Sequence, residues 1–180
     1  MTKGASIQAV DADNITPLHF SAAKGHTDIV ELLLTKSAFI ESVDRHDRRT
    51  PLHLSAGQGH TDIVELLLTK GASIEAVDRL GKRTPLHFSA QSGHTGVVER
   101  LLTKGASIEA VYADNNTPLH FAAQWGHTGV VELLLTKGAS IEAVNARNNT
   151  PLDLAAGGGH AGKVQVLRNK AAKLAEVMGI

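Results

Sequence analysis

A four-residue string recurs along the whole 180-residue sequence at an interval of 33 or 34 residues. It reads Thr-Pro-Leu-His in four copies and Thr-Pro-Leu-Asp in the fifth, and the copies begin at Thr16, Thr50, Thr84, Thr117 and Thr150. Each copy is followed at a fixed offset by Gly-His, and a segment close to Lys-Gly-Ala-Ser-Ile-Glu-Ala-Val precedes the later copies. A unit of this size cannot bury its own apolar face, so neighbouring units are expected to stack on one another.

Each unit carries the signals of two short helices. The first is expected to begin at Thr16-Pro17, because the hydroxyl can cap free amides and proline fits the first helical position, and to stop at Gly25. The second is expected to run from Thr27, whose hydroxyl can cap it, to Lys36 at its basic last turn. In later units we expect the second helix to end at Gly71, Gly105 and Gly138.

The apolar residues of the second helix repeat on one face, which in the first unit holds Ile29, Val30, Leu33 and Leu34. Only 3% of the residues are aromatic, although 42% are hydrophobic. A single compact core with so few aromatic side chains would be unusual, whereas stacked units form a continuous core from small and aliphatic residues. The sequence therefore predicts an all-α repeat solenoid.

The pattern resembles the ankyrin repeat, because it combines Thr-Pro-Leu-His, Ala-x-x-Gly-His and a Leu-Leu-x-x-Gly-Ala segment over residues 4–172. The resemblance implies stacked antiparallel helix pairs joined by hairpin loops, in one ankyrin-repeat domain that spans residues 1–180. It also implies a non-catalytic module that binds a partner protein through its hairpin tips and concave helix face. We expect a partial N-terminal hairpin arm, four units and a C-terminal capping unit, at residues 1–15, 16–49, 50–83, 84–116, 117–149 and 150–180.

The hairpins differ more than the helices do. Those that end at Thr50 and Thr84 are one residue longer than the others, and we place the extra residue at the tip, where insertions are best tolerated. In the shorter hairpins Asn14, Asn115 and Asn148 occupy the position where the family prefers Gly, so we expect a left-handed turn there. The turn Asp found as Asp11, Asp44 and Asp78 is replaced by Tyr112 and Asn145 in the last two hairpins.

The two ends of the repeat array also differ. Lys163 and Arg168 replace apolar residues of the other units, which predicts a capping unit whose outer face stays in contact with water. At the other end Thr2 to Ile7 matches the middle of a repeat, which suggests a fragment of a longer array or an uncapped face. We expect a monomer that could self-associate through this N-terminal face.

The histidines invite a metal hypothesis, but their positions argue against it. Nine of the ten lie in Thr-Pro-Leu-His or Gly-His, so they recur along the solenoid instead of converging on one point. In the ankyrin family such histidines hydrogen-bond within and between repeats, and we expect the same role here. Ser21, Ser55 and Ser89 are interpreted as small packing residues. The sequence thus predicts no metal, no cofactor and no catalytic group.

The overall charge excludes other classes of protein. Eighteen basic and eighteen acidic side chains give a net charge of zero, which disfavours a dedicated nucleic-acid binder. The apolar runs are far shorter than the roughly 20 residues of a membrane span, and no signal peptide is recognisable. We therefore expect a soluble cytoplasmic protein that contacts neither nucleic acid nor membrane.

Residues that differ between equivalent units are the candidates for partner binding. Trp125 is the only Trp, at a position held by Lys24, Gln58, Ser92 and Gly158 in the other units, and exposed aromatic residues often anchor interfaces. Tyr112 in the preceding hairpin is a second aromatic candidate. The remaining predicted contact residues of the first helices and hairpins are Lys24, Gln58, Gln91, Ser92, Gln124, Leu80, Asn116 and Arg147.

The two longer hairpins add a basic patch that could attract an acidic protein surface and steer its approach. Asp44, Asp47 and Asp78 dilute this charge, so a role in solubility is the alternative. Its predicted contact residues are Arg45, His46, Arg48, Arg49, Arg79, Lys82 and Arg83. Two other interpretations of the whole chain stay open, a structural spacer and an engineered consensus scaffold without a natural ligand, because the units are unusually alike.

Overall fold

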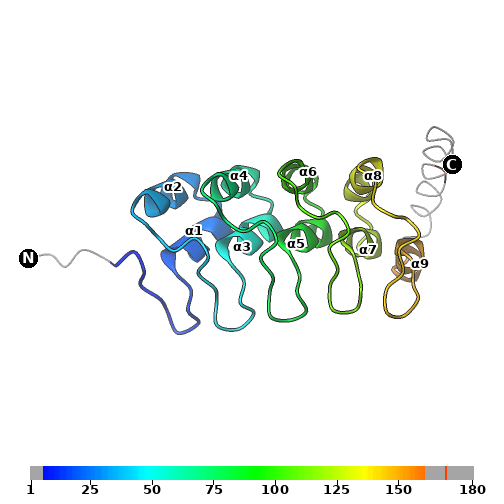
Figure 1. The fold of residues 1–180 in the computed structure, drawn as a ribbon, viewed down its shortest axis with the longest axis horizontal. Helices are drawn as coiled ribbons and strands as arrows, with labels where there is room; N and C mark the ends of the chain where they lie inside the picture. Colours follow the sequence, from blue (N-terminus) through cyan, green and yellow to red (C-terminus); the bar gives the residue numbers. More distant parts are fainter. Residues whose placement is uncertain (1–5, 161–168, 170–180) are drawn as a thin grey trace, which may run out of the picture.

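The computed structural model describes residues 6–160 and residue 169. Within these residues the chain forms helices and connecting loops, with no strand (Figure 1). The helices are α1 (Pro17–Lys24), α2 (Thr27–Thr35), α3 (Pro51–Gln58), α4 (Thr61–Thr69), α5 (Pro85–Ser92), α6 (Thr95–Thr103), α7 (Pro118–Gln124), α8 (Thr128–Thr136) and α9 (Pro151–Gly157). Lys163 and Arg168, and with them the prediction of a charged outer face, lie outside the described residues.

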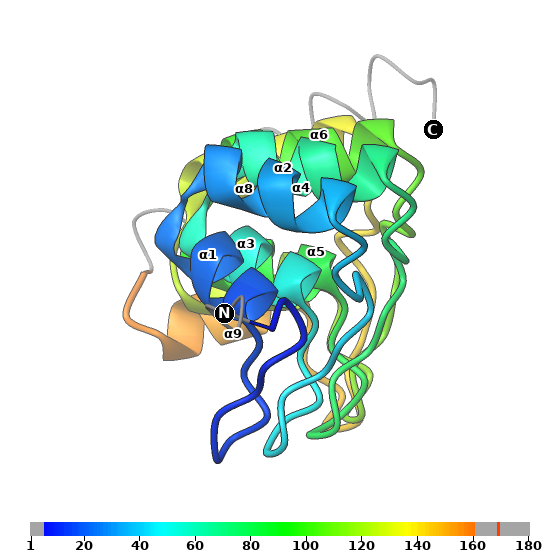
Figure 2. The ribbon, with the colours of Figure 1, turned by 90° about the vertical axis from the view of Figure 1, so that its left-hand side faces the viewer.

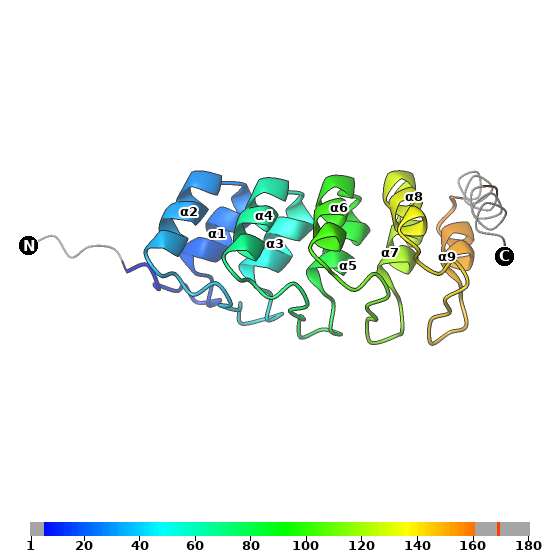
Figure 3. The same cartoon turned by 45° about the horizontal axis from the view of Figure 1, so that its top comes forward.

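The helices form two layers. One layer holds the first helix of each unit, from α1 to α9, and the other holds α2, α4, α6 and α8 (Figures 1 and 3). Each first helix contacts the next first helix along the chain, as in α3 and α5, and each second helix contacts the next second helix. The hairpins extend away from both layers on one side, roughly across the helix axes (Figure 2). The all-α stacked architecture predicted from the repeat is therefore confirmed.

The first helices begin as predicted, with one partner that the sequence did not reveal. The amide of His19 donates to Thr16 Oγ1 at 3.3 Å, while the amide and the hydroxyl of Thr16 both donate to His19 Nδ1, at 3.2 and 2.9 Å. This reciprocal capping satisfies amides that have no partner inside the helix. Because Nδ1 accepts both bonds, His19 is neutral and carries its proton on Nε2, which donates at 3.1 Å to the carbonyl of Arg49, at the end of the hairpin that leads to the next unit.

The prediction that Thr27 caps the second helix is wrong. Helix α2 already includes Thr27, and the capping position is His26, whose side chain makes no capping bond. A hydroxyl can cap only from the residue before the first helical one, and here the turn at Gly25 engages the amide of Thr27 at 3.1 Å. The predicted helix end at Gly25 is confirmed, since Gly25 has a φ of 80°.

Glycine is required before the second helix for a second reason. The carbonyl of Gly57 accepts a bond of 3.0 Å from His94 Nε2 of the next unit, so the His94 ring lies against the end of α3. A side-chain carbon added to Gly59 would approach His94 Nδ1 to 2.6 Å, closer than real atoms come. In the Gly-His pair the Gly thus forms the turn within its own unit, and the His contacts the preceding unit.

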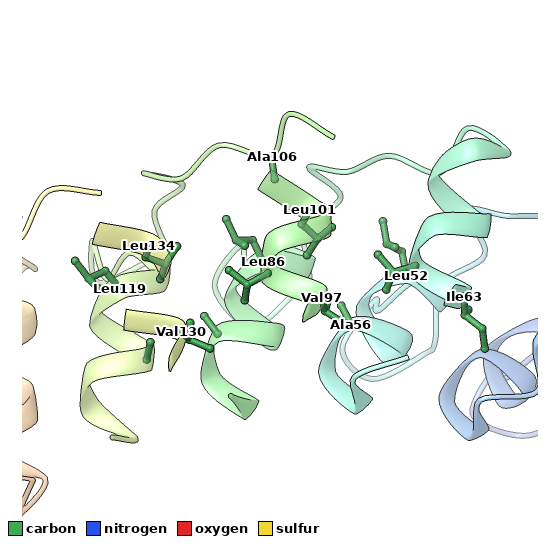
Figure 4. Close-up of a cluster of buried hydrophobic side chains, with 14 of the residues drawn as sticks. Leu52, Ala56, Ile63, Leu86, Val97, Leu101, Ala106, Leu119, Val130 and Leu134 are labelled. Atoms are coloured by element: carbon green, nitrogen blue, oxygen red, sulfur yellow. The ribbon is translucent and has the colours of Figure 1, made fainter. Parts of the chain in front are cut away.

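The core is one apolar layer that runs through the stack (Figure 4). We call it the seam, and its members are Leu52, Leu86, Leu119, Ile63, Val97, Leu101, Val130 and Leu134, each at most 1% exposed. The predicted apolar face of the first unit is only partly buried, because Val30 is buried while Ile29 is 48% exposed. Ile63, the equivalent of Ile29 in the next unit, is covered by the preceding unit, and no described residue covers Ile29 in that way.

Candidate protein-binding surface

Five hairpins form a row along one side of the stack (Figure 2). We number them 1 to 5, at residues 10–15, 43–49, 77–83, 111–116 and 144–149. In hairpins 2 to 5 a backbone amide near the tip donates to a carbonyl of the preceding hairpin, which fixes the tips as one continuous surface. These bonds are Arg45 N to Asp13 O (2.8 Å), Arg79 N to Asp47 O (2.6 Å), Ala113 N to Gly81 O (2.8 Å) and Ala146 N to Asp114 O (2.7 Å).

The predicted left-handed residues of the short hairpins are confirmed. Asn14, Asn115 and Asn148 have φ values of 61°, 58° and 59°. In the longer hairpins the same conformation is held by Arg48 (55°) and Lys82 (68°), which are less suited to it than Asn. The two longer tips therefore place an exposed cation at the turn itself.

The turn Asp holds its own hairpin together. Asp11 Oδ1 accepts the amides of Asp13 and Ile15, and Asn145 Oδ1 accepts those of Arg147 and Asn149 in the same way. Asn145 therefore accepts the same two backbone hydrogen bonds as the Asp that it replaces. Tyr112, at the equivalent position of hairpin 4, has no side-chain acceptor of this kind and has to be explained by packing.

Tyr112 packs between hairpin 3 and helix α7. Its ring meets the edge of Phe121 with centroids 5.7 Å apart and an interplanar angle of 76°. On its other side it lies so close to Gly81 that a side-chain carbon there would overlap the ring. Gly81 was not among the predicted site residues. The sequence contained a signal for it, because the equivalent residue of hairpin 2 is Asp47 and not Gly.

A hollow of about 260 Å³ opens between hairpins 3 to 5 and the first-helix layer. We call it the aromatic hollow, and it is lined by Arg83, Tyr112, Asp114, Asn116, Phe121, Gln124, Asn145, Arg147, Asn149 and Leu154. It brings together five of the predicted contact residues, namely Tyr112, Gln124, Asn116, Arg83 and Arg147. Trp125 is not part of its lining.

Trp125 lies at the end of α7, where its amide donates to the carbonyl of Phe121 at 3.1 Å. Its side chain is 54% exposed, and no ring or cation among the described residues stacks on it. The equivalent residues Lys24, Gln58 and Ser92 are also exposed, so this position faces solvent in every unit. Gln91 differs from these three, because it is half-buried and its carbonyl accepts a bond from His127.

Two of the predicted tip cations form ion pairs within the protein. Arg49 pairs with Asp47 at 2.7 Å, and Arg83 pairs with Asp78 at 2.9 Å. Both guanidinium groups also stack on the ring of Phe88, at 5.1 and 4.5 Å from its centroid. The sequence showed the opposite charges but not the aromatic ring between the two arginines, which comes from a later unit than either of them.

The other tip cations remain exposed. Arg45, Arg48 and Arg79 line a second hollow, of about 560 Å³, which we call the basic hollow; the rest of its lining is Asp11, Ala12, Asn14, Val43 and Asp44. Lys82 and Leu80 are exposed nearby on hairpin 3. His46 Nε2 contacts Asp13 Oδ1 at 2.9 Å, so this exposed histidine links hairpins 1 and 2.

The histidines of the Thr-Pro-Leu-His motifs have structural partners. In His53 and His87 the ring bonds the Thr that begins its own helix and a carbonyl at the end of the following hairpin. Burial lowers the pKa of both His53 and His87 to about 4, against the opposing effect of their backbone hydrogen bonds. Over residues 6–160 and residue 169, no group of three or more acidic or histidine side chains is placed to hold a metal ion.

These features define the class of protein, an all-α solenoid of stacked helix pairs with projecting hairpins. The family model described as ankyrin repeats (3 copies) matches residues 1–78, 18–114 and 86–177, and the chain therefore belongs to the ankyrin repeat family. None of the curated proteins matches the sequence. In the part of the chain that the structure describes, no helix is long and apolar enough to cross a membrane.

Proposed function

We propose that this chain is a non-catalytic protein–protein interaction module that holds its partner between the hairpin tips and the first-helix layer. Ankyrin repeats generally act as such modules, which supports the class of function. The observation that carries the proposal for this chain is the exposure of Trp125. Large exposed aromatic side chains without a packing role are typical anchors of protein interfaces.

The comparison between units supports a role for Trp125 outside the fold. The same position holds Lys24, Gln58 or Ser92 in units of the same architecture, so folding does not require an indole there. Next to it, Gln124 lines the aromatic hollow together with Tyr112. A partner side chain that enters this hollow would lie beside an aromatic surface that remains accessible.

The test compares the intact protein with Trp125→Ala as bait for partners in a lysate of the source cells, followed by calorimetric titration of each purified partner. We expect Trp125→Ala to weaken binding by about 2 kcal/mol or more, because buried aromatic anchors dominate interfaces. Its free energy of unfolding should change by less than about 0.5 kcal/mol, as is usual for an exposed residue.

The matched control is Lys137→Ala, which shortens an exposed side chain at the end of α8, in the second-helix layer of the same unit, and should leave both quantities unchanged. If Trp125→Ala destabilises the fold and leaves the affinity intact, Trp125 is a packing residue and the proposed surface is wrong. If no protein binds in a Trp125-dependent way, the spacer interpretation replaces this one.

A further inference from the structure

We propose that the basic hollow binds a short, carboxylate-rich peptide segment of the partner through Arg45, Arg48 and Arg79. This inference rests on the proposed function, since it assigns a chemistry to one part of the same surface. It starts from the difference between the tip cations that are paired within the protein and those that are exposed. Arg49 and Arg83 are paired and stacked inside the protein, whereas the three arginines of the hollow are exposed.

The carboxylates in the hollow do not neutralise these arginines. Asp11 Oδ1 accepts two backbone amides of its own hairpin, at 3.0 and 2.8 Å. Asp44 is 8% exposed, and its Oδ1 accepts the amide of Asp47 at 2.7 Å. Over the described residues, no carboxylate lies within ion-pair distance of Arg45, Arg48 or Arg79.

The backbone fixes the hairpin tips that carry the three arginines, and it also holds the side chain of Arg45. Arg45 donates from Nη1 to the carbonyl of Ala12 at 3.2 Å, which orients its guanidinium group across hairpins 1 and 2. The amide of Arg79 donates to Asp47 and ties hairpin 3 to hairpin 2. Arg48 sits at the left-handed turn of hairpin 2, between the other two hairpins. Such fixed positions reduce the entropy that binding has to overcome.

The order of basic and acidic side chains along the row of hairpins determines which ligand fits. A guanidinium group pairs with a carboxylate through two parallel hydrogen bonds, so three of them suit a segment with several acidic side chains. Asp13 on hairpin 1 and Asp114 on hairpin 4 are exposed and bound the basic stretch on both sides. A long phosphate backbone would meet these two carboxylates, whereas a short acidic peptide would span only hairpins 2 and 3.

The experiment is a fluorescence anisotropy titration of the whole chain with a labelled octapeptide of alternating Glu and Ser. We expect saturable binding that weakens as salt is added, and at least tenfold weaker binding of the peptide with Gln in place of Glu. The double variant Arg48→Gln/Arg79→Gln should lose at least tenfold in affinity. Its thermal unfolding should match that of the parent, because neither side chain has a partner among the described residues.

The matched control is Lys36→Gln/Lys70→Gln, which removes the same charge from exposed lysines at the ends of α2 and α4. It should change the affinity less than twofold. Equal losses in the two double variants would overturn the proposal, because binding would then follow net charge alone. A phosphoserine version of the peptide that binds while the Glu version does not would overturn the choice of carboxylate.

The outcome is separable from that of the proposed function. If the Glu peptide fails to bind while a protein partner still depends on Trp125, only the assignment of the basic hollow is wrong. If the peptide binds through Arg48 and Arg79 while no partner depends on Trp125, the basic hollow stands and the surface around Trp125 does not.

Discussion

Leu86 and Leu80 lie close together in the sequence but belong to opposite regions of the molecule. Leu86 is 1% exposed in the seam, between the first helices of successive units, whereas Leu80 is 58% exposed at the tip of hairpin 3. The seam repeats the same residue types in every unit, because each unit has to fit the next. The tips vary in length and charge, since their side chains are mostly exposed and the amide-to-carbonyl bond between successive tips does not depend on residue type.

The difference teaches that a residue shared by all units is committed to the fold, but the converse does not hold. Tyr112 is peculiar to its hairpin and Arg83 is shared only with Arg49 of hairpin 2, and yet they pack against Phe121 and Phe88. Trp125 and Arg79 are equally variable and remain exposed. Variation between units therefore marks candidates for binding, and only the contacts decide which of them are available.

The largest loss of stability should come from acidification, through the buried histidines of the first helices, which lie beside the seam. The pKa of His53 and His87 is lowered from 6.5 to about 4 in the folded protein, so between these values the unfolded state binds more protons. Their stabilisation is complete above pH 6.5 and is lost as the pH falls toward 4, by roughly 3 kcal/mol for each histidine. Protonation of Nδ1 also removes the acceptor of the Thr cap.

Urea unfolding at a series of pH values from 7 to 4 measures this loss. The variant His87→Gln should show a shallower dependence of the free energy of unfolding on pH, while Leu80→Ala, which removes no titratable group from an exposed tip, should keep the slope of the parent. A parental slope in His87→Gln would mean that the buried histidine does not titrate with the fold.

The next largest effect should come from truncation of the seam itself. We expect Leu86→Ala to cost about 2 to 5 kcal/mol, because it removes buried methyl groups and leaves a cavity between two units. Leu80→Ala removes the same atoms from a hairpin tip and should change stability by less than about 0.5 kcal/mol. Urea unfolding followed by circular dichroism compares the two, and similar costs would contradict the division into seam and tips.

The sequence predicted most of the helix boundaries and of the buried apolar face, but few of the contacts that the side chains of the hairpin tips make. Helix starts at Thr-Pro and ends at Gly are local signals, so they could be read from single units. The engagement of Arg49 and Arg83 could not, because it depends on Phe88, which lies in a later unit than either arginine. The error at Thr27 has a different origin, since the local turn at Gly25 sets where that helix begins.

The pair of Gly81 and Tyr112 tests whether a tip residue can be structural. Gly81→Ala should cost about 2 kcal/mol, because the added carbon overlaps the Tyr112 ring and has to displace it from Phe121. Gly57→Ala is the control, since its added carbon would lie at an ordinary 3.6 Å from Phe88 within a helix, where Ala is about 0.5 to 1 kcal/mol better than Gly. We expect that variant to be more stable.

A double-mutant cycle identifies the cause. In the background of Tyr112→Ala, Gly81→Ala should cost almost nothing, because the ring that the added carbon would overlap is gone. The measurement is thermal unfolding of the four proteins of the cycle. If the cost of Gly81→Ala persists without Tyr112, it comes from the backbone of hairpin 3.

The smallest effect should distinguish two arginines of the same hairpin. Arg83→Gln should cost about 1 kcal/mol, because it breaks the pair with the buried Asp78 and the stacking on Phe88 while the backbone amide of residue 83 still donates to Asp78. Arg79→Gln should leave stability unchanged, since Arg79 is exposed and makes no ion pair among the described residues. In the anisotropy titration the order should reverse, with Arg79→Gln weakening the binding of the Glu peptide more than Arg83→Gln does. We expect Arg83 to stabilise the fold and Arg79 to bind the ligand. Equal effects of the two variants in both measurements would show that the two arginines do not have these separate roles.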